Sequence, residues 1–211
     1  MRRLLMPLVP GLVAALVLAP SASAECANAD TEPTATNTPE LGSALKCLLN
    51  ERRARRGVHR LGTHRGLAGA AQAHSEHMVA HGYFSHDTPG GVDPFERMKR
   101  AGYIGARFSW NASETVAWGE GKLATPRSIL RAWLDEPSQR LTLLAPDFRD
   151  VGVGVAFGAP VAGGLSGLAT ATYTVDYGWR VTKKALRRCL NRAAEKQGRA
   201  RRMHRASCHG L

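Results

Sequence analysis

The hydrophobic period of this chain changes from helical spacing to alternation after residue 150, and the change sets the class of fold. "VGVGVAF" at residues 151–157 alternates valine with glycine, and "LATATYTVDYG" at residues 168–178 alternates small or apolar residues with threonines. This alternation predicts two β-strands, and the glycine-rich segment between them predicts a hairpin. Before residue 137 the apolar residues recur at helical spacing instead. Helices followed by a late hairpin predict an α+β fold in which helices pack on a small antiparallel sheet.

Four helices are predicted ahead of the strands. They run from Thr38 to Gly57, from Gly66 to His81, from Asp93 to Gly102, and from Thr125 to the residue before Pro137. Three of them begin with Thr-Pro or Asp-Pro, a pair in which the first residue can cap the helix and proline fits the first turn. A shorter helix is predicted beyond Arg180, where a narrow apolar stripe runs among arginines: Leu186, Cys189, Leu190 and Ala193.

The first 24 residues have the pattern of a secretory signal peptide. Two arginines follow Met1, an apolar run covers residues 4–18, and Ala22-Ser23-Ala24 provides a cleavage site. The run is too short for a membrane anchor and is interrupted by prolines. The arginine pair leaves twin-arginine export open as the alternative route. We therefore expect a secreted, extracellular protein that begins near Glu25, with small polar residues 25–37 forming a flexible leader.

Four cysteines remain after the signal peptide: Cys26, Cys47, Cys189 and Cys208. An even number in an exported chain favours disulfides, and four cysteines allow three pairings. We expect the two local pairings, Cys26 with Cys47 and Cys189 with Cys208. A zinc site is the rival interpretation, but no C-x-x-C spacing supports it.

The positive charge of the chain is concentrated at its end. The net charge is +12, and residues 180–211 hold eleven Lys/Arg against a single acid, Glu195. Residues 181–211 are therefore expected to form a basic tail with a short helix. Such a run can be a solvated face. It can also bind anionic cell-wall polymers or membrane-surface headgroups, and we expect this to hold the protein at the cell surface. Export argues against nucleic acid as the partner.

Eight segments of the chain resemble, in order, a bacterial member of the CAP superfamily, which comprises cysteine-rich secretory proteins, antigen 5 and plant pathogenesis-related 1 proteins. They read "LLNERRARRG", "AAQAHSEHM", "YFSHDTPGG", "AGY", "SETVAWGEG", "AWLDEPSQRLTLL", "FRDVGVGVAFG" and "TYTVDYG". No single segment is specific, but their order is. The resemblance places a CAP (SCP-like) domain at residues 38–180 and implies a three-layer α-β-α sandwich with an open cleft.

The resemblance also implies which side chains face the cleft. His86 in "YFSHDTPGG" should project into it beside Tyr83, and Glu114 in "SETVA" should face His86. The family places a second histidine in a later turn, where this chain has Gln139. The expected ligand-binding residues are therefore His86, Glu114, Gln139 and Tyr83. Without the resemblance, His86 would be interpreted as capping its own turn.

The glutamine bears on metal binding. Two imidazoles and a carboxylate can hold zinc, whereas a carboxamide oxygen is a much poorer donor. We expect His86 and Glu114 to bind zinc weakly at most, and no cofactor to be required. His74, His77 and His81 have a metal-like spacing, but His74 falls on the apolar face, so a packed, hydrogen-bonded histidine is the favoured interpretation.

The sequence gives little support for an enzyme. It contains no G-x-S-x-G or H-E-x-x-H pattern, and its cysteines are expected to form disulfides. We therefore expect a non-catalytic extracellular binding module with a degenerate His/Glu cleft. Its ligand can be a lipid, a glycan or a protein. The alternative is a divergent extracellular hydrolase that acts on cell-wall material or peptides through His86 and Glu114.

Overall fold

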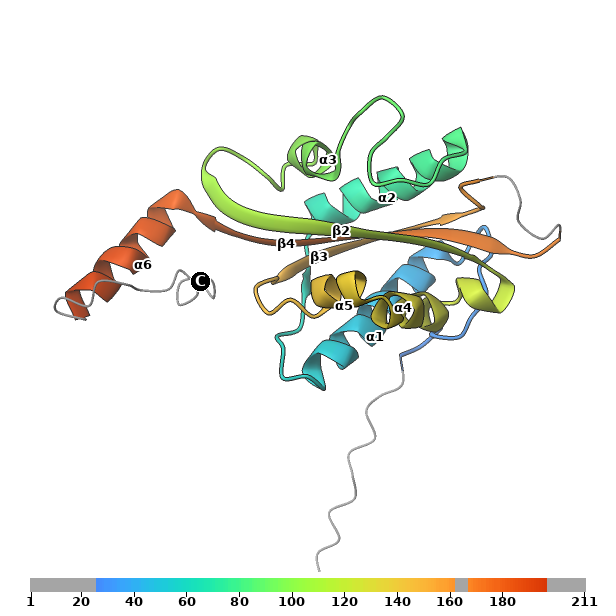
Figure 1. Cartoon of the computed structure of the whole chain (residues 1–211), viewed down its shortest axis with the longest axis horizontal. Helices are drawn as coiled ribbons and strands as arrows, with labels where there is room; N and C mark the ends of the chain where they lie inside the picture. Colours follow the sequence, from blue (N-terminus) through green and yellow to red (C-terminus); the bar gives the residue numbers. More distant parts are fainter. Residues whose placement is uncertain (1–25, 162–166, 197–211) are drawn as a thin grey trace, which may run out of the picture.

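A central sheet lies between two layers of helices (Figure 1). The computed structural model describes residues 26–161 and 167–196, so the predicted signal peptide (residues 1–24) and Cys208 lie outside the described residues. Helices α2 (Arg65–His81) and α3 (Pro94–Arg100) cover one face of the sheet. Helices α1 (Thr38–Ala54), α4 (Pro126–Asp135) and α5 (Pro137–Leu143) cover the other. The predicted α+β sandwich is confirmed.

The sheet has the strand order β1-β3-β4-β2. Strands β3 (Asp150–Phe157) and β4 (Thr170–Thr182) form the predicted hairpin, and β2 (Phe108–Glu120) is antiparallel to β4. The two-residue strand β1 (Gly62–Thr63) joins β3 in parallel, so the sheet is mixed rather than wholly antiparallel. Among the described residues, β2 is the one long element that periodicity did not predict, because polar and apolar residues do not alternate cleanly along it.

Helix α2 lies directly on the backbone of β3. A Cβ atom added at Gly154 would lie 2.3 Å from the carbonyl carbon of Ala71, and one added at Gly152 would lie 2.0 Å from that of Leu67. Real Cβ contacts are never this short, so the valine–glycine alternation is required by the approach of the helix. The hydroxyl of Ser75 in α2 then donates to the carbonyl of Gly154 at 3.2 Å.

The larger apolar core lies on the opposite face. Its buried members come from α1, α4, α5, β3 and β4, and include Leu41, Leu45, Leu49, Ile129, Trp133, Leu143, Val151, Val155, Tyr173 and Tyr177. Within this core the fully buried guanidinium of Arg53 donates to the carbonyls of His59, Leu143, Ala145 and Phe148 at 2.7–3.2 Å. Burial lowers the pKa of Arg53 to about 10, so the group remains charged at neutral pH. It therefore ties α1 to the segment between α5 and β3.

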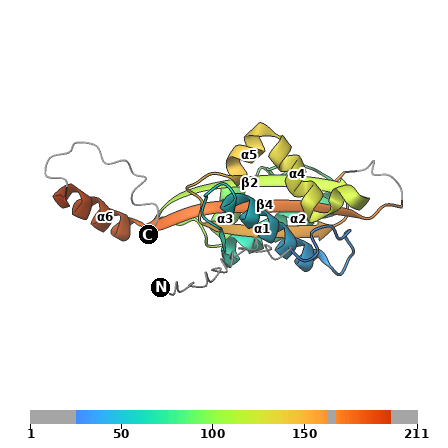
Figure 2. The ribbon, with the colours of Figure 1, turned by 90° about the horizontal axis from the view of Figure 1, so that it is seen from below.

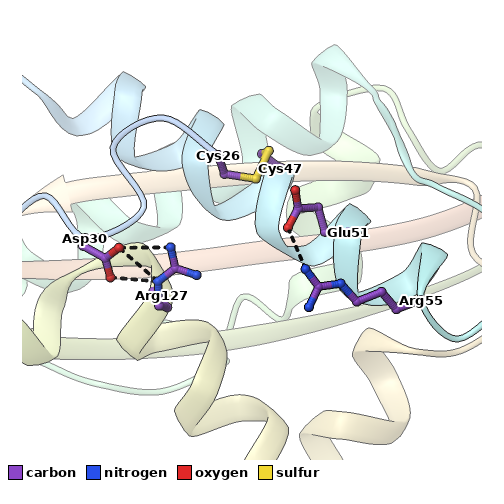
Figure 3. The surroundings of a disulfide bond; sticks show 6 residues. All are labelled: Cys26, Asp30, Cys47, Glu51, Arg55 and Arg127. Carbon is purple, nitrogen blue, oxygen red and sulfur yellow. Dashed lines mark hydrogen bonds and ion pairs between the residues drawn. A yellow bond between two sulfur atoms is a disulfide. The ribbon is translucent and has the colours of Figure 1, made fainter. Parts of the chain in front are cut away.

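The segment before α1 is packed on the protein. Cys26 forms the predicted disulfide with Cys47 of α1, and Ala29 is buried in the core cluster. Asp30 accepts two hydrogen bonds from Nε of Arg127 in α4, at 2.8 and 3.0 Å, and a third from Nη2 (Figure 3). Residues 26–37 thus differ from the flexible leader that composition predicted, because one covalent bond and one ion pair fasten them to two helices.

The last described helix, α6 (Lys183–Lys196), projects from the end of β4 (Figure 2). Its first residue is bonded to the body through the Lys183 amide, which donates to the carbonyl of Arg107 at 2.9 Å. The predicted basic helix is therefore present. Within the described residues, no helix has the length and apolar character needed to cross a membrane.

Replacement of glycine by alanine should have opposite effects on the free energy of unfolding at two positions of this fold. Gly154→Ala should lower the free energy of unfolding by about 3 kcal/mol or more, since its methyl group would meet the backbone of α2. Gly69→Ala, on the exposed side of α2 with nothing within 4 Å of the added atom, should raise it by about 0.5–1 kcal/mol. Urea unfolding of the oxidised protein measures both. Equal effects would contradict the close packing of α2 on β3.

Candidate functional site

The loop between α2 and α3 presents His86. Helix α2 ends at Gly82, whose left-handed conformation (φ 66°) turns the chain back over the helix. The loop then closes on itself through two hydrogen bonds between Thr88 and Val92. Asp93 caps α3 by accepting from the Glu96 amide at 2.7 Å. These contacts fix both ends of the segment, so the position of His86 is set by the fold.

Glu114 of β2 is the centre of the site. Its side chain is 1% exposed, whereas that of His86 is 49% exposed. Nδ1 of His86 lies 2.8 Å from Oε1 of Glu114, and Nη2 of Arg97 donates to Oε2 at 2.6 Å. Both carboxylate oxygens are therefore engaged by cationic or hydrogen-bonding groups. Burial raises the pKa of Glu114, but the contacts with His86 and Arg97 outweigh it and lower the pKa overall.

Arg97 of α3 is a part of the site that sequence reasoning missed. Besides Glu114, it donates to the carbonyls of His86 and Val92, at 2.8 and 3.0 Å. It therefore joins the loop to the sheet and holds His86 against Glu114. The sequence offered no signal for this role, because Arg97 is one of several cations in a short helix, and only the folded chain distinguishes it.

Asp176 of β4 is the second residue that was missed. It faces Glu114 across the β2–β4 ladder and is 1% exposed. Burial and the neighbouring Glu114 carboxylate raise the pKa of Asp176 well above its usual range. A side-chain hydrogen bond between the two carboxyl groups acts in the same direction. Two carboxyl groups thus share the site, and the Arg97 guanidinium lies against one of them.

His74 of α2 holds the loop that carries His86 through a hydrogen bond. It is buried, and its Nε2 lies 2.9 Å from the carbonyl of Ser85 and 4.0 Å from Glu114. Burial lowers the pKa of His74, so the ring is neutral and donates its Nε2–H to that carbonyl. The prediction of a packed, hydrogen-bonded histidine is confirmed.

The other predicted residues are distributed around this centre. The hydroxyl of Tyr83 lies 2.8 Å from Nδ1 of His77, which stacks on His81, so Tyr83 contacts the histidines of α2. Gln139 lies on α5, in the layer with α1. No hydrogen bond of the described residues links Gln139 to His86 or Glu114. The structure therefore brings together His86 and Glu114, whereas Tyr83 contacts His77 and His74 of α2.

His86 and Glu114 are not arranged as a chelating pair. Nδ1 of His86 points at Glu114, and the Arg97 guanidinium occupies the other carboxylate oxygen. A divalent cation bound by both side chains would have to break both contacts and lie beside a fixed positive charge. The chemistry that the site can perform is that of an oriented imidazole, because Nε2 of the half-exposed His86 ring is left to accept or donate a proton.

Comparisons with known proteins agree on one family. The model of the "Cysteine-rich secretory protein family" (CAP) matches residues 48–177. The uncharacterized protein YkwD of Bacillus subtilis is 32% identical over 139 residues, and the match covers 64% of this chain. It covers 51% of YkwD, so this chain spans about half the length of that relative.

Two solved structures are similar in fold. An outer surface protein of Borrelia burgdorferi is 17% identical, with a TM-score of 0.55 over 71% of this chain and 98% of the other. An extracellular protein with a SCP domain from Bacillus anthracis is 24% identical, with a TM-score of 0.49 over 67% of this chain and 39% of the other. The first comparison supports the fold, and the second is too weak to add to it.

The pKa values of the two histidines of the site should be shifted in opposite directions from that of free histidine. The hydrogen bond to Glu114 raises the pKa of His86, and burial lowers that of His74. The His86–Glu114 contact therefore stabilises the fold below about pH 6.5, the unfolded value. This contribution is lost as pH rises through the raised pKa of His86. Histidine ring resonances followed by NMR against pH measure both groups, and Glu114→Gln should lower the pKa of His86. A His86 that titrates below free histidine would contradict the geometry.

Proposed function

Because the chain belongs to the cysteine-rich secretory protein (CAP) family, we propose that it is a secreted, non-catalytic binding protein whose His86–Glu114 site contacts an extracellular ligand. Two features support secretion: the signal-peptide pattern of residues 1–24 and the disulfide between Cys26 and Cys47. Disulfides persist in oxidising surroundings outside the cytoplasm. The ligand is an extracellular lipid, glycan or protein that presents a hydrogen-bonding group to the ring of His86.

The engagement of Glu114 is the observation that carries this proposal. Its two oxygens are held by His86 and Arg97, so the carboxylate orients the ring and is not free to attack a substrate. Covalent catalysis by an oriented histidine also needs a nucleophilic hydroxyl or thiol. In the described part of the chain, no hydroxyl or thiol hydrogen-bonds to His86. The nearby Ser85 hydroxyl accepts from the Asp87 amide at 3.2 Å.

A hydrolase remains the second candidate because of one observation. A carboxylate 2.8 Å from an exposed imidazole is the arrangement of a general base and the group that orients it. Such a pair can activate water that a bound substrate positions. Hydrolysis by this pair would depend on His86.

The basic end of the chain is proposed to hold the protein at the cell surface. Helix α6 extends away from the body, and its cations are exposed along the described side chains: Lys183, Lys184, Arg187, Arg188 and Arg192. A projecting cationic helix can contact a polyanion without blocking the His86 site. Anionic wall polymers or lipid headgroups are the partners that this charge suits.

His86→Ala should release the ligand without unfolding the protein. Protein recovered from its native culture medium should carry a small molecule or polypeptide that mass spectrometry identifies, and His86→Ala should retain at least about tenfold less. His59→Ala, at an exposed histidine elsewhere, is the matched control. Peptidoglycan and peptide substrates should give no turnover with any variant. Turnover that disappears in His86→Ala would establish the hydrolase instead, and equal retention of ligand by all three proteins would exclude His86 from the site.

Removal of α6 and the residues beyond it should detach the protein from cells. The cut belongs after Thr182, because Val181 is buried and paired with Ser109 in the sheet. Surface-bound protein should fall at least about tenfold in the truncated form, and in the full chain as salt rises to 0.5 M, where charges are screened within about 4 Å. A full-length variant with glutamine at the five exposed cations of α6 distinguishes the effect of the charge from the effect of the helix itself. If the truncated protein stays equally bound at low salt, the basic end is a solvated face.

A further inference from the structure

A hollow at the open edge of the sheet is separate from the His86 site. It has a volume of about 440 Å³ and lies between α1 and α2, with β3 as its floor. Its lining includes Gly42, Ser43 and Lys46 from α1, Ala68 and Gln72 from α2, and Val153 from β3. The small residues on both helices leave the strand edge accessible from outside.

The outward backbone groups of Val151 and Val155 in β3 have different hydrogen-bond partners. The carbonyl of Val151 accepts from the amide of His64, just after β1, at 2.9 Å. The amide and carbonyl of Val155 both bond to the side-chain amide of Gln72, each at 3.0 Å. Gln72 thus occupies the place that a neighbouring strand's peptide group would take.

Val153 lies between Val151 and Val155, and its backbone groups point to the same side of the strand as theirs. Alternate residues of a strand direct their backbone groups to the same side, so the N–H and C=O of Val153 face the hollow. No hydrogen bond from the described residues reaches either group from that side. The floor of the hollow is therefore one unpaired peptide position in an otherwise capped sheet edge.

Lys46 adds a charge at one end of the hollow. Its ammonium group donates to the Thr63 hydroxyl at 2.7 Å, which places it beside the end of β1. None of the described carboxylates forms an ion pair with it. An extended ligand along β3 would therefore meet a cation at the Val151 end and the Gln72 amide at the other.

We propose that this hollow binds the C-terminal end of an extended peptide, which pairs antiparallel with β3. An antiparallel residue opposite Val153 exchanges two hydrogen bonds with it. A chain running in this direction ends toward β1, where its terminal carboxylate meets Lys46. This site goes beyond the His86 function and does not depend on it.

The size of the hollow limits what can bind. The edge from Val151 to Val155 spans about 13 Å, which fits two or three residues of a single extended chain. Val151 and Val155 already have partners at this edge, so one residue of that chain exchanges hydrogen bonds with β3, at Val153. Addition of a strand to a sheet edge supplies main-chain hydrogen bonds, and the cation at one end supplies selectivity for a free carboxylate.

The test uses the peptide acetyl-Ala-Val-Ala with a free C-terminus and the same peptide with a C-terminal amide. Titration into the ¹⁵N-labelled full chain should shift the Val153 amide and the Gln72 side-chain amide. Amidation of the peptide, or Lys46→Ala in the protein, should weaken binding about fivefold. Lys122→Ala, at an exposed lysine remote from the hollow, should leave it unchanged.

Val153→Pro provides a second route. It removes the outward N–H while leaving the bonds to β4 intact, because the N–H of Val153 faces away from β4, and should abolish the shifts. If this variant fails to fold, the Lys46 and amide comparisons still decide. Three results would overturn the proposal: no shift at about 10 mM peptide, equal binding of acid and amide, or shifts confined to the His86 loop.

Discussion

The contact of α2 with β3 at backbone distance is the constraint on which the rest of the structure depends. Only glycine at positions 152 and 154 permits it. Once α2 lies there, its buried His74 reaches the carbonyl of Ser85, and the loop that follows is held over the sheet. His86 then lies against Glu114. The His86–Glu114 contact therefore depends on the absence of a Cβ atom at two positions of β3.

Burial of the Glu114 carboxylate costs free energy, and the surrounding residues offset this cost together. A lone buried carboxylate is costly, and a second one beside it more so. Here Arg97 supplies the positive charge, the raised pKa of Asp176 favours its neutral form, and His86 contacts Glu114 on the side that faces water. Since Arg97 also holds the loop, the same contact that neutralises the carboxylate positions the imidazole.

The sequence predicted what depends on local pattern. The valine–glycine and threonine strands were recognisable because both of their faces are constrained, and the helices predicted from Thr-Pro or Asp-Pro pairs lie where expected. Asp93 and Thr125 cap their helices, whereas Thr38 is the first residue of α1 and Asn37 before it makes no side-chain cap. The resemblance located His86 and Glu114. Arg97 and Asp176 could not be found, because their roles arise from the β2–β4 register and from a helix that packs on it. Periodicity also failed for β2, whose two faces meet different surroundings along its length.

The order of the strands has a consequence for how the chain can fold. The two central strands, β3 and β4, are the last of the sheet in sequence, and three of the four carbonyls that accept from Arg53 lie ninety or more residues further on. A chain that emerges from its N-terminus first therefore presents α1 and α2 long before the surface that buries them exists. Its helices have no sheet to pack on until residues 150–182 arrive. The native packing of these helices can therefore form only after the last two strands are available.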